Sequence, residues 1–140
     1  MTAQEQYVEF GIEREQYAIR IQDIHEIIKM QDITHIPGVL PYVKGVINLR
    51  GKIVPVLSLR DLFGMEEQPY TKQTRIVVVN HAVDTVGIIV DRVSKVTTFN
   101  DIQAPQGRFG GLDGRLFTGI GLTGGGLVGI LQLEEVLLQD

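Results

Sequence analysis

The sequence has no cysteine and no tryptophan, and it has only 4 tyrosines and 5 phenylalanines. Without thiols the chain forms no disulfide and offers no thiolate as a nucleophile or metal ligand. Proteins that bind single-stranded nucleic acid need stacking aromatics and a basic groove. This chain has few rings, a net charge of −4 and no cluster of Lys and Arg. The composition therefore disfavours a nucleic-acid partner.

Long apolar runs are missing as well. No stretch approaches the roughly 20 residues that span a bilayer, and the first residues show no basic segment followed by an apolar core. We therefore predict a cytoplasmic protein without direct membrane insertion. The 140 residues, 44% hydrophobic and 21% charged, are typical of a globular domain.

A weak internal repeat is the main positive feature. From Tyr7 the sequence reads YVEFGIEREQYAIRIQDIHEII, and from Ile76 it reads IVVVNHAVDTVGIIVDRVSKVT with matched apolar positions. Gly11 aligns with Asn80, and both residue types accept the positive φ of a hairpin turn. Further on, INLRG-KIVPVLSLRDLF aligns with IGLTGGGLVGILQLEEVL. The repeat predicts two similar modules of about seventy residues each that share apolar surface.

Short β-branched runs bounded by Gly, Asn or Asp predict a mainly β fold made of small barrels or a sandwich. Ile21 to Ile28 also fits a helical stripe, but its counterpart in the second copy favours a strand. Pro55 interrupts one strand, where a missing N–H is tolerated at an edge or a bulge. Short helices are expected at Arg60 to Phe63 and at Glu134 to Leu138.

Motifs that carry chemistry are weak. Gly119, Gly121 and Gly124 form G-x-G-x-x-G, but a strand pattern follows instead of the helix that a dinucleotide site requires, so we expect a hairpin turn. The three histidines, His25, His35 and His81, share no local spacing of a metal site. We therefore predict no catalytic residue, no cofactor and no metal.

Arg50 and Glu26 are the two charged residues that merit attention. Arg50 lies in Asn48-Leu49-Arg50-Gly51 before the most apolar strand of the first copy, and Glu26 interrupts an apolar run. Arg50 is either a turn residue that donates to nearby carbonyls or a guanidinium at a partner surface. Glu26 is either on the solvent side of a strand or a charge within an apolar contact surface.

GVINLRGKIVPVLSLRDLFG, from Gly45 to Gly64, resembles the signature of the bacterial chemotaxis coupling protein family CheW. YAIRIQDIHEIIK, PYVKGVINLRG, VVVN…VGIIVDRVSKV and LFTGIGLTGGGLVGILQLEEVL extend the resemblance over nearly the whole chain in family order. One departure is Ser58, where relatives commonly carry Asp or Asn, which puts a local cap in question.

The resemblance implies one CheW-like domain over 1–140, built from two SH3-like five-stranded β-barrels with short helices. We place subdomain one at about 11–69 and subdomain two at about 1–10 plus 70–140. By resemblance, the strand Gln4 to Phe10 adds to the second barrel.

The resemblance also implies a non-catalytic scaffold that couples chemoreceptors to a histidine kinase. The partners would be the regulatory domain of the histidine kinase CheA and the cytoplasmic tip of methyl-accepting chemotaxis receptors. Ile24, Glu26 and Ile27 would face the receptor, Gly45, Gly87 and Val93 would lie near the groove between the barrels, and Arg50 would support the barrel or a partner interface. The residues expected to bind receptor or kinase are thus Ile24, Glu26, Ile27, Gly45, Arg50, Gly87 and Val93.

Two hypotheses from other classes compete with this one. A single-stranded nucleic-acid binder is second, because small barrels often have that role, and retention on single-stranded DNA at moderate salt would support it. An enzyme is third, and turnover abolished by one point mutation would support that class.

Overall fold

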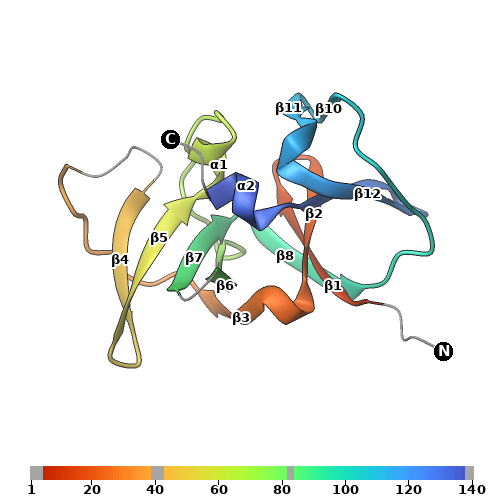
Figure 1. The fold of residues 1–140 in the computed structure, drawn as a ribbon. Coiled ribbons are helices and arrows are strands. Elements are labelled where there is room, and N and C mark those ends of the chain that lie inside the picture. Colours follow the sequence, from red (N-terminus) through yellow and green to blue (C-terminus); the bar gives the residue numbers. More distant parts are fainter. Residues whose placement is uncertain (1–4, 39–42, 82–83, 138–140) are drawn as a thin grey trace. The chain divides into compact units, whose positions relative to one another are not determined.

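The computed structural model describes residues 5–38, 43–81 and 84–137 (Figure 1). The chain divides into two compact units. The central unit comprises residues 23–92, and the terminal unit combines the residues up to Gln22 with those from Val93 onward. Each unit is built around one β-sheet with short helices.

The central unit holds a five-stranded sheet in the order β3-β6-β7-β5-β4. Its elements are β3 (Ile24–Lys29), β4 (Val43–Leu49), β5 (Lys52–Ser58), α1 (Leu59–Leu62), β6 (Arg75–His81) and β7 (Asp84–Val90). β5 and β7 are parallel, and the other neighbours are antiparallel. After β3 the chain returns to the far edge strand, where Thr34 and Val46 exchange two backbone hydrogen bonds of 2.9 Å. This bridge closes the sheet into a small barrel.

Branched aliphatic side chains fill this barrel. The core cluster is Ile47, Val54, Val56, Ile76, Val78 and Ile89, with Ile28, Met30, Ile33 and Leu49 packed against it. Val and Ile suit a closed sheet because their branched side chains pack well on a pleated surface. Burying each such side chain contributes about 1.5–3 kcal/mol.

The terminal unit holds a six-stranded sheet in the order β8-β1-β2-β13-β12-β9. Its strands are β1 (Tyr7–Ile12), β2 (Glu15–Arg20), β8 (Arg92–Thr97), β9 (Ile102–Gln103), β12 (Phe117–Thr123) and β13 (Gly126–Leu131). The short β10 (Arg108–Phe109) and β11 (Leu112–Asp113) pair separately, and the helical turns are η1 (Ile21–Asp23), η2 (Gly114–Leu116) and α2 (Leu133–Leu137). β9 follows edge strand β8 and pairs with β12, so this sheet also returns to its far edge.

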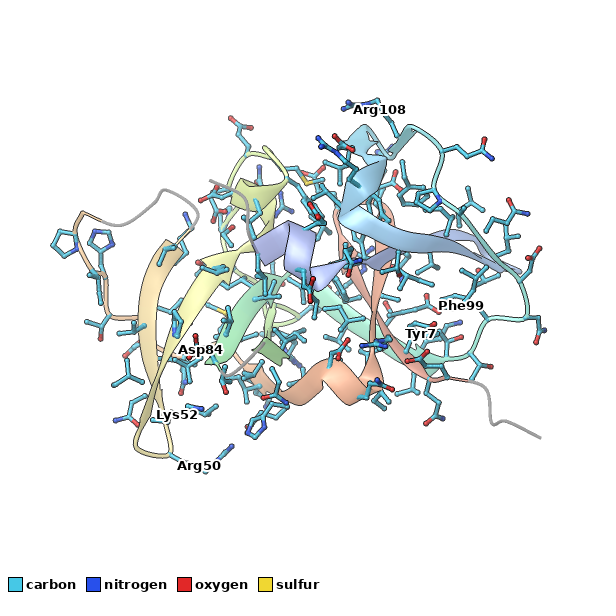
Figure 2. The ribbon with its side chains drawn as sticks, viewed as in Figure 1. Tyr7, Arg50, Lys52, Asp84, Phe99 and Arg108 are labelled. Carbon is cyan, nitrogen blue, oxygen red and sulfur yellow. The ribbon has the colours of Figure 1, made fainter. Side chains whose placement is uncertain are left out.

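Aromatic rings pack in the terminal unit where the central unit uses aliphatic residues. The rings of Tyr7 and Phe99, labelled in Figure 2, lie 5.1 Å apart at 53°. Phe109 meets Phe117 edge-on at 5.2 Å. A Cβ atom on Gly129 would come within 2.7 Å of the Phe117 ring, so only glycine leaves room for these rings.

The two sheets have equivalent strand orders but are not the two copies of the repeat. In the central sheet the hairpin β6–β7 of the second copy joins β3, β4 and β5 of the first, and in the terminal sheet the hairpin β1–β2 joins β8, β12 and β13 of the second (Figure 1). Equivalent pairs occur in both, such as Glu9 opposite Ala18 and Val78 opposite Gly87. The observed units therefore correct the predicted subdomains, 11–69 and 1–10 plus 70–140, because each copy gives its first hairpin to the other sheet.

Several local predictions agree with the structure. β3 is a strand preceded by a single 3-10 turn, and both predicted helices form within a residue of the expected start. The predicted N-terminal strand lies in the sheet that contains β12 and β13. Gln4 at its expected start and Leu138 at the end of the second helix fall outside the described residues.

The predicted turn role of Gly11 is wrong. Gly11 pairs with Gln16 within the hairpin β1–β2, and the positive φ of 54° is at Glu13 in the two-residue loop that follows. Asn80 likewise pairs with Thr85 inside β6–β7. The glycine motif forms strand, turn and strand, because Gly119 and Gly121 lie in β12 and Gly124 lies in the turn before β13.

Candidate functional site

Arg50 lies at the tip of the hairpin formed by β4 and β5 (Figure 2). Leu49 pairs with Lys52, which leaves Arg50 and Gly51 as a two-residue loop with φ values of 52° and 87°. Two positive φ angles define a type I′ turn, in which Asn or Gly usually occupies the first position. The Asn48 side chain steadies the turn by accepting a 2.7 Å hydrogen bond from Gly51 N. A positive φ costs a non-glycine residue about 1–2 kcal/mol.

The Arg50 guanidinium forms an ion pair with Glu26 of β3, 24 residues earlier in the chain. The Arg50 side chain is 67% exposed and that of Glu26 is 24% exposed. His25 Nε2 lies 3.7 Å from the same Glu26 oxygen. Exposed ion pairs typically contribute 0–1 kcal/mol to stability, which does not offset the strained turn. Backbone strain of this kind is a reason to look for function at the site.

Exposed apolar side chains occur on the same two elements as this ion pair. In β3, Ile24 is half-buried, whereas Ile27 is 37% exposed. In the hairpin β4–β5, Ile53 is 61% exposed three residues after Arg50. We call Glu26, Ile27, Arg50 and Ile53 the hairpin surface. Charged and exposed apolar side chains on the same two elements give the mixed character of a protein-binding surface.

The other predicted site residues lie elsewhere. Gly45 is buried in β4 with a φ of 147°, and a Cβ atom there would lie 2.0 Å from the Thr34 carbonyl oxygen. Gly87 is buried in β7, where a Cβ atom would meet Ile76 at 2.8 Å. Both glycines thus allow close packing inside the central barrel and present no side chain to a partner. Val93 is half-buried in β8 of the terminal unit.

A polar network that the sequence reading missed lies around α1. Lys44 Nζ is 2.8 Å from Asp61 Oδ2 and 3.8 Å from Glu67 Oε2. Burial alone would lower the pKa of the Lys44 ammonium, but the hydrogen bond to Asp61 and the charge of Glu67 outweigh it and raise the pKa. Nearby, the Arg60 Nε donates to Asp91 at 2.9 Å beside a cavity of about 420 Å³. These charged groups pair with one another, which suits a structural role.

Ser58 is the cap of α1. Its side chain accepts a 3.2 Å hydrogen bond from Asp61 N and donates to Glu67. The cap questioned at this position is therefore present, with serine in place of the more usual Asp or Asn. The sequence signal was a residue type favoured at helix starts, two residues before the expected helix.

Ser58→Ala is expected to lower the free energy of unfolding by about 1 kcal/mol, because it removes the cap and the donor to Glu67. Thermal unfolding followed by circular dichroism measures the change. Ser58→Asn, which retains an acceptor for the Asp61 N–H, should restore most of the loss. Equal melting temperatures for wild type and Ser58→Ala would show that the cap contributes nothing.

Within residues 5–38, 43–81 and 84–137, no three His, Asp or Glu side chains gather as metal ligands. In the same residues no helix has the length and apolar character needed to cross a membrane.

Comparison with known proteins agrees with the fold. The CheW-like domain family matches residues 6–140. The chain is 37% identical over 136 residues to the chemotaxis protein CheW of Helicobacter pylori, covering 96% of this chain and 82% of the relative. It is 38% identical over 106 residues to that of Bacillus subtilis, covering 74% and 68%.

A solved structure is similar over the full chain. The crystal structure of the scaffolding protein TtCheW from Thermoanaerobacter tengcongensis superposes with a TM-score of 0.90 at 31% identity, covering 100% of this chain and 92% of the other. The chain therefore belongs to the CheW family of chemotaxis scaffolding proteins.

Proposed function

We propose that the protein is a non-catalytic adaptor that joins the cytoplasmic tips of methyl-accepting chemotaxis receptors to the regulatory domain of the histidine kinase CheA. Family membership supports a role in chemotaxis signalling. The observation that carries the proposal is the ion pair between Glu26 of β3 and Arg50 on a strained turn, with the exposed Ile27 and Ile53 on the same two elements. This arrangement costs stability and offers a partner both charge and apolar area.

A helical partner suits the hairpin surface. An amphipathic helix laid on an exposed apolar strip is a common mode of recognition, and a receptor tip is a helical hairpin by resemblance to the family. We expect each contact to be of micromolar order, about −8 kcal/mol. Multiple weak contacts in one assembly raise the effective concentration of each, so modest contacts give a stable array.

The test is co-sedimentation of the purified protein with receptor-bearing membranes and the kinase, in pairs and in the three-way mixture. We expect the kinase to pellet with receptors only when the adaptor is present. Glu26→Lys should reduce this recovery. Glu66→Lys, an equal charge change at an exposed position of the central unit outside the hairpin surface, should not. Kinase recovery that does not depend on the adaptor would contradict the proposal.

A further inference from the structure

Glu9 is a charged residue at a core position. It lies in the middle of β1 and is 4% exposed. Its counterpart in the repeat is Val78, which is 0% exposed in the core of the central unit. Each faces a small residue across its hairpin, Ala18 in one case and Gly87 in the other. The fold thus accepts valine at this position, and a carboxylate is not needed to form the sheet.

One oxygen of the Glu9 carboxylate has no hydrogen-bond partner among the residues that the structure describes. Glu9 Oε1 accepts from Gln16 Nε2 at 3.3 Å, and the same amide nitrogen lies 3.2 Å from Ser94 Oγ. Glu9 Oε2 is buried and receives no donor from this part of the chain. Burying an acceptor that lacks a donor opposes folding. Glu9 thus lowers the stability of its unit, whereas its counterpart Val78 does not. A residue of this kind is a candidate for a functional role.

Glu9 lines a pocket within the terminal unit. The pocket has a volume of about 560 Å³ and is formed by Glu9, Gln16, Ser94, Lys95 and the β12–β13 hairpin from Thr123 to Val128. A Cβ atom added to Gly124 or Gly126 would meet nothing within 4 Å, so both of these lining glycines border open space. Leu127 is 51% exposed and offers apolar contact there. The pocket therefore combines a buried anion with an accessible, partly apolar mouth.

In the central unit, the strand and the hairpin turn that are equivalent to the walls of this pocket carry the Arg50–Glu26 ion pair. By the repeat, the counterpart of Arg50 is Thr123 and that of Glu26 is Lys95. In the central unit the hairpin turn brings its own guanidinium to a carboxylate. In the terminal unit the equivalent turn has no basic side chain, and the carboxylate is that of Glu9 on β1. The hairpin turn that supplies a cation in the central sheet therefore has no counterpart that could supply one to Glu9 in the terminal sheet.

We propose that this pocket receives the guanidinium group of an arginine side chain from a partner polypeptide. Its N–H groups donate to the carboxylate of Glu9, which lines the pocket, and a guanidinium is the cation best suited to a carboxylate because it donates in a fixed planar geometry. The methylene stem of the arginine packs on Leu127 at the entrance. An isolated small cation would gain only the charge interaction with Glu9 and no packing on Leu127. This difference favours an arginine side chain of a protein as the ligand. This proposal does not depend on the hairpin surface of the central unit.

The test is an NMR titration of the full-length chain with N-acetyl-arginine amide at constant ionic strength, with N-acetyl-citrulline amide as the uncharged probe of the same shape. We expect saturable amide shifts confined to residues 94–95 and 123–128 with the arginine probe and none with citrulline. Glu9→Gln should weaken binding about tenfold or more, since a charged hydrogen bond is lost. Its melting temperature should equal or exceed that of the wild type.

Two further variants keep the test decisive. Glu9→Val places the residue of the second copy at this position, so it should fold, melt higher and also lose the binding. Glu134→Gln removes an equal charge from exposed α2 and should leave the shifts unchanged. Equal responses to arginine and citrulline, or shifts that survive Glu9→Gln, would overturn the proposal.

Lys95 provides the last control, because it lines the same pocket. If Lys95 were the partner of Glu9 in solution, Lys95→Met would lower the melting temperature and tighten binding of the arginine probe more than tenfold. That result would also overturn the proposal. We expect Lys95→Met to leave the melting temperature unchanged and to change probe affinity less than threefold, since the exposed ammonium is screened by solvent.

Discussion

Glu26→Lys is expected to weaken binding to receptor or kinase about tenfold or more while changing the free energy of unfolding by less than about 0.5 kcal/mol. The substitution replaces an attraction with a repulsion beside Arg50, at a place where both side chains reach solvent. Solvent screens the effect on stability. A partner that covers the surface would exclude that solvent, so the repulsion grows on binding. Isothermal titration with the kinase regulatory domain, and separately with a receptor-tip fragment, measures the change.

The charge-swapped double variant, Glu26→Lys with Arg50→Glu, tests whether the pair acts as a unit. We expect it to regain part of the lost affinity, because an ion pair of reversed polarity again holds the turn against β3. A double variant as weak as Glu26→Lys alone would show that each charge contacts the partner directly. Thermal unfolding of Glu26→Lys is the control. A collapse of the fold in that variant would make Glu26 structural and remove it from the hairpin surface.

The strands of this protein are predictable from short patterns. Runs such as RIVVVN and VGIIVD contain β-branched residues at four of six positions, and they form most of β6 and β7 because both faces of these strands are largely buried. The sequence predicts an edge or a bulge at Pro55. It pairs with Val46 of β4, beside the irregular register between Val43 and Gly45, and the ladder of β5 with β7 begins only at Val56.

The grouping of strands into units could not be predicted in this way. The two first hairpins have the same pattern, since Glu9 and Val78 face Ala18 and Gly87 at equivalent positions. Local pattern does not distinguish pairing within a copy from pairing with the other copy. The predicted subdomains assumed that each hairpin pairs within its own copy. The parallel pairs β5–β7 and β13–β2 show that each hairpin pairs with strands of the other copy.

Glu26, Ile27 and Arg50 of the hairpin surface were predictable from the sequence, but Ile53 and the geometry of the surface were not. Arg50 and Glu26 each stand out in the sequence as a charge in an apolar setting, yet nothing in the sequence pairs these two residues, which are 24 positions apart. The barrel closure that brings β3 toward the β4–β5 hairpin depends on the Thr34–Val46 bridge. Glu9 was missed because a single carboxylate in a strand usually faces solvent. Its alignment with Val78 was the available signal.

Gly45→Ala is expected to destabilise the protein by about 3 kcal/mol or more, since it combines a steric clash with a disfavoured backbone conformation. The added methyl group would lie 2.0 Å from the Thr34 carbonyl oxygen, which cannot withdraw while it accepts the Val46 N–H at 2.9 Å. Relieving the clash therefore means breaking the bridge that closes the central barrel. Chemical denaturation gives the free energy of unfolding.

Gly38→Ala is the matched control, because Gly38 also has a positive φ, of 83°, but a Cβ atom there meets nothing within 4 Å. It should cost about 1–2 kcal/mol, the backbone contribution alone. The difference between the two variants measures the contact with Thr34. If Gly45→Ala instead kept the wild-type stability and lost partner binding, Gly45 would be a contact residue, as the family resemblance first suggested. Its burial against the Thr34 carbonyl leads us to expect the opposite: loss of the fold, with weaker binding only as its consequence.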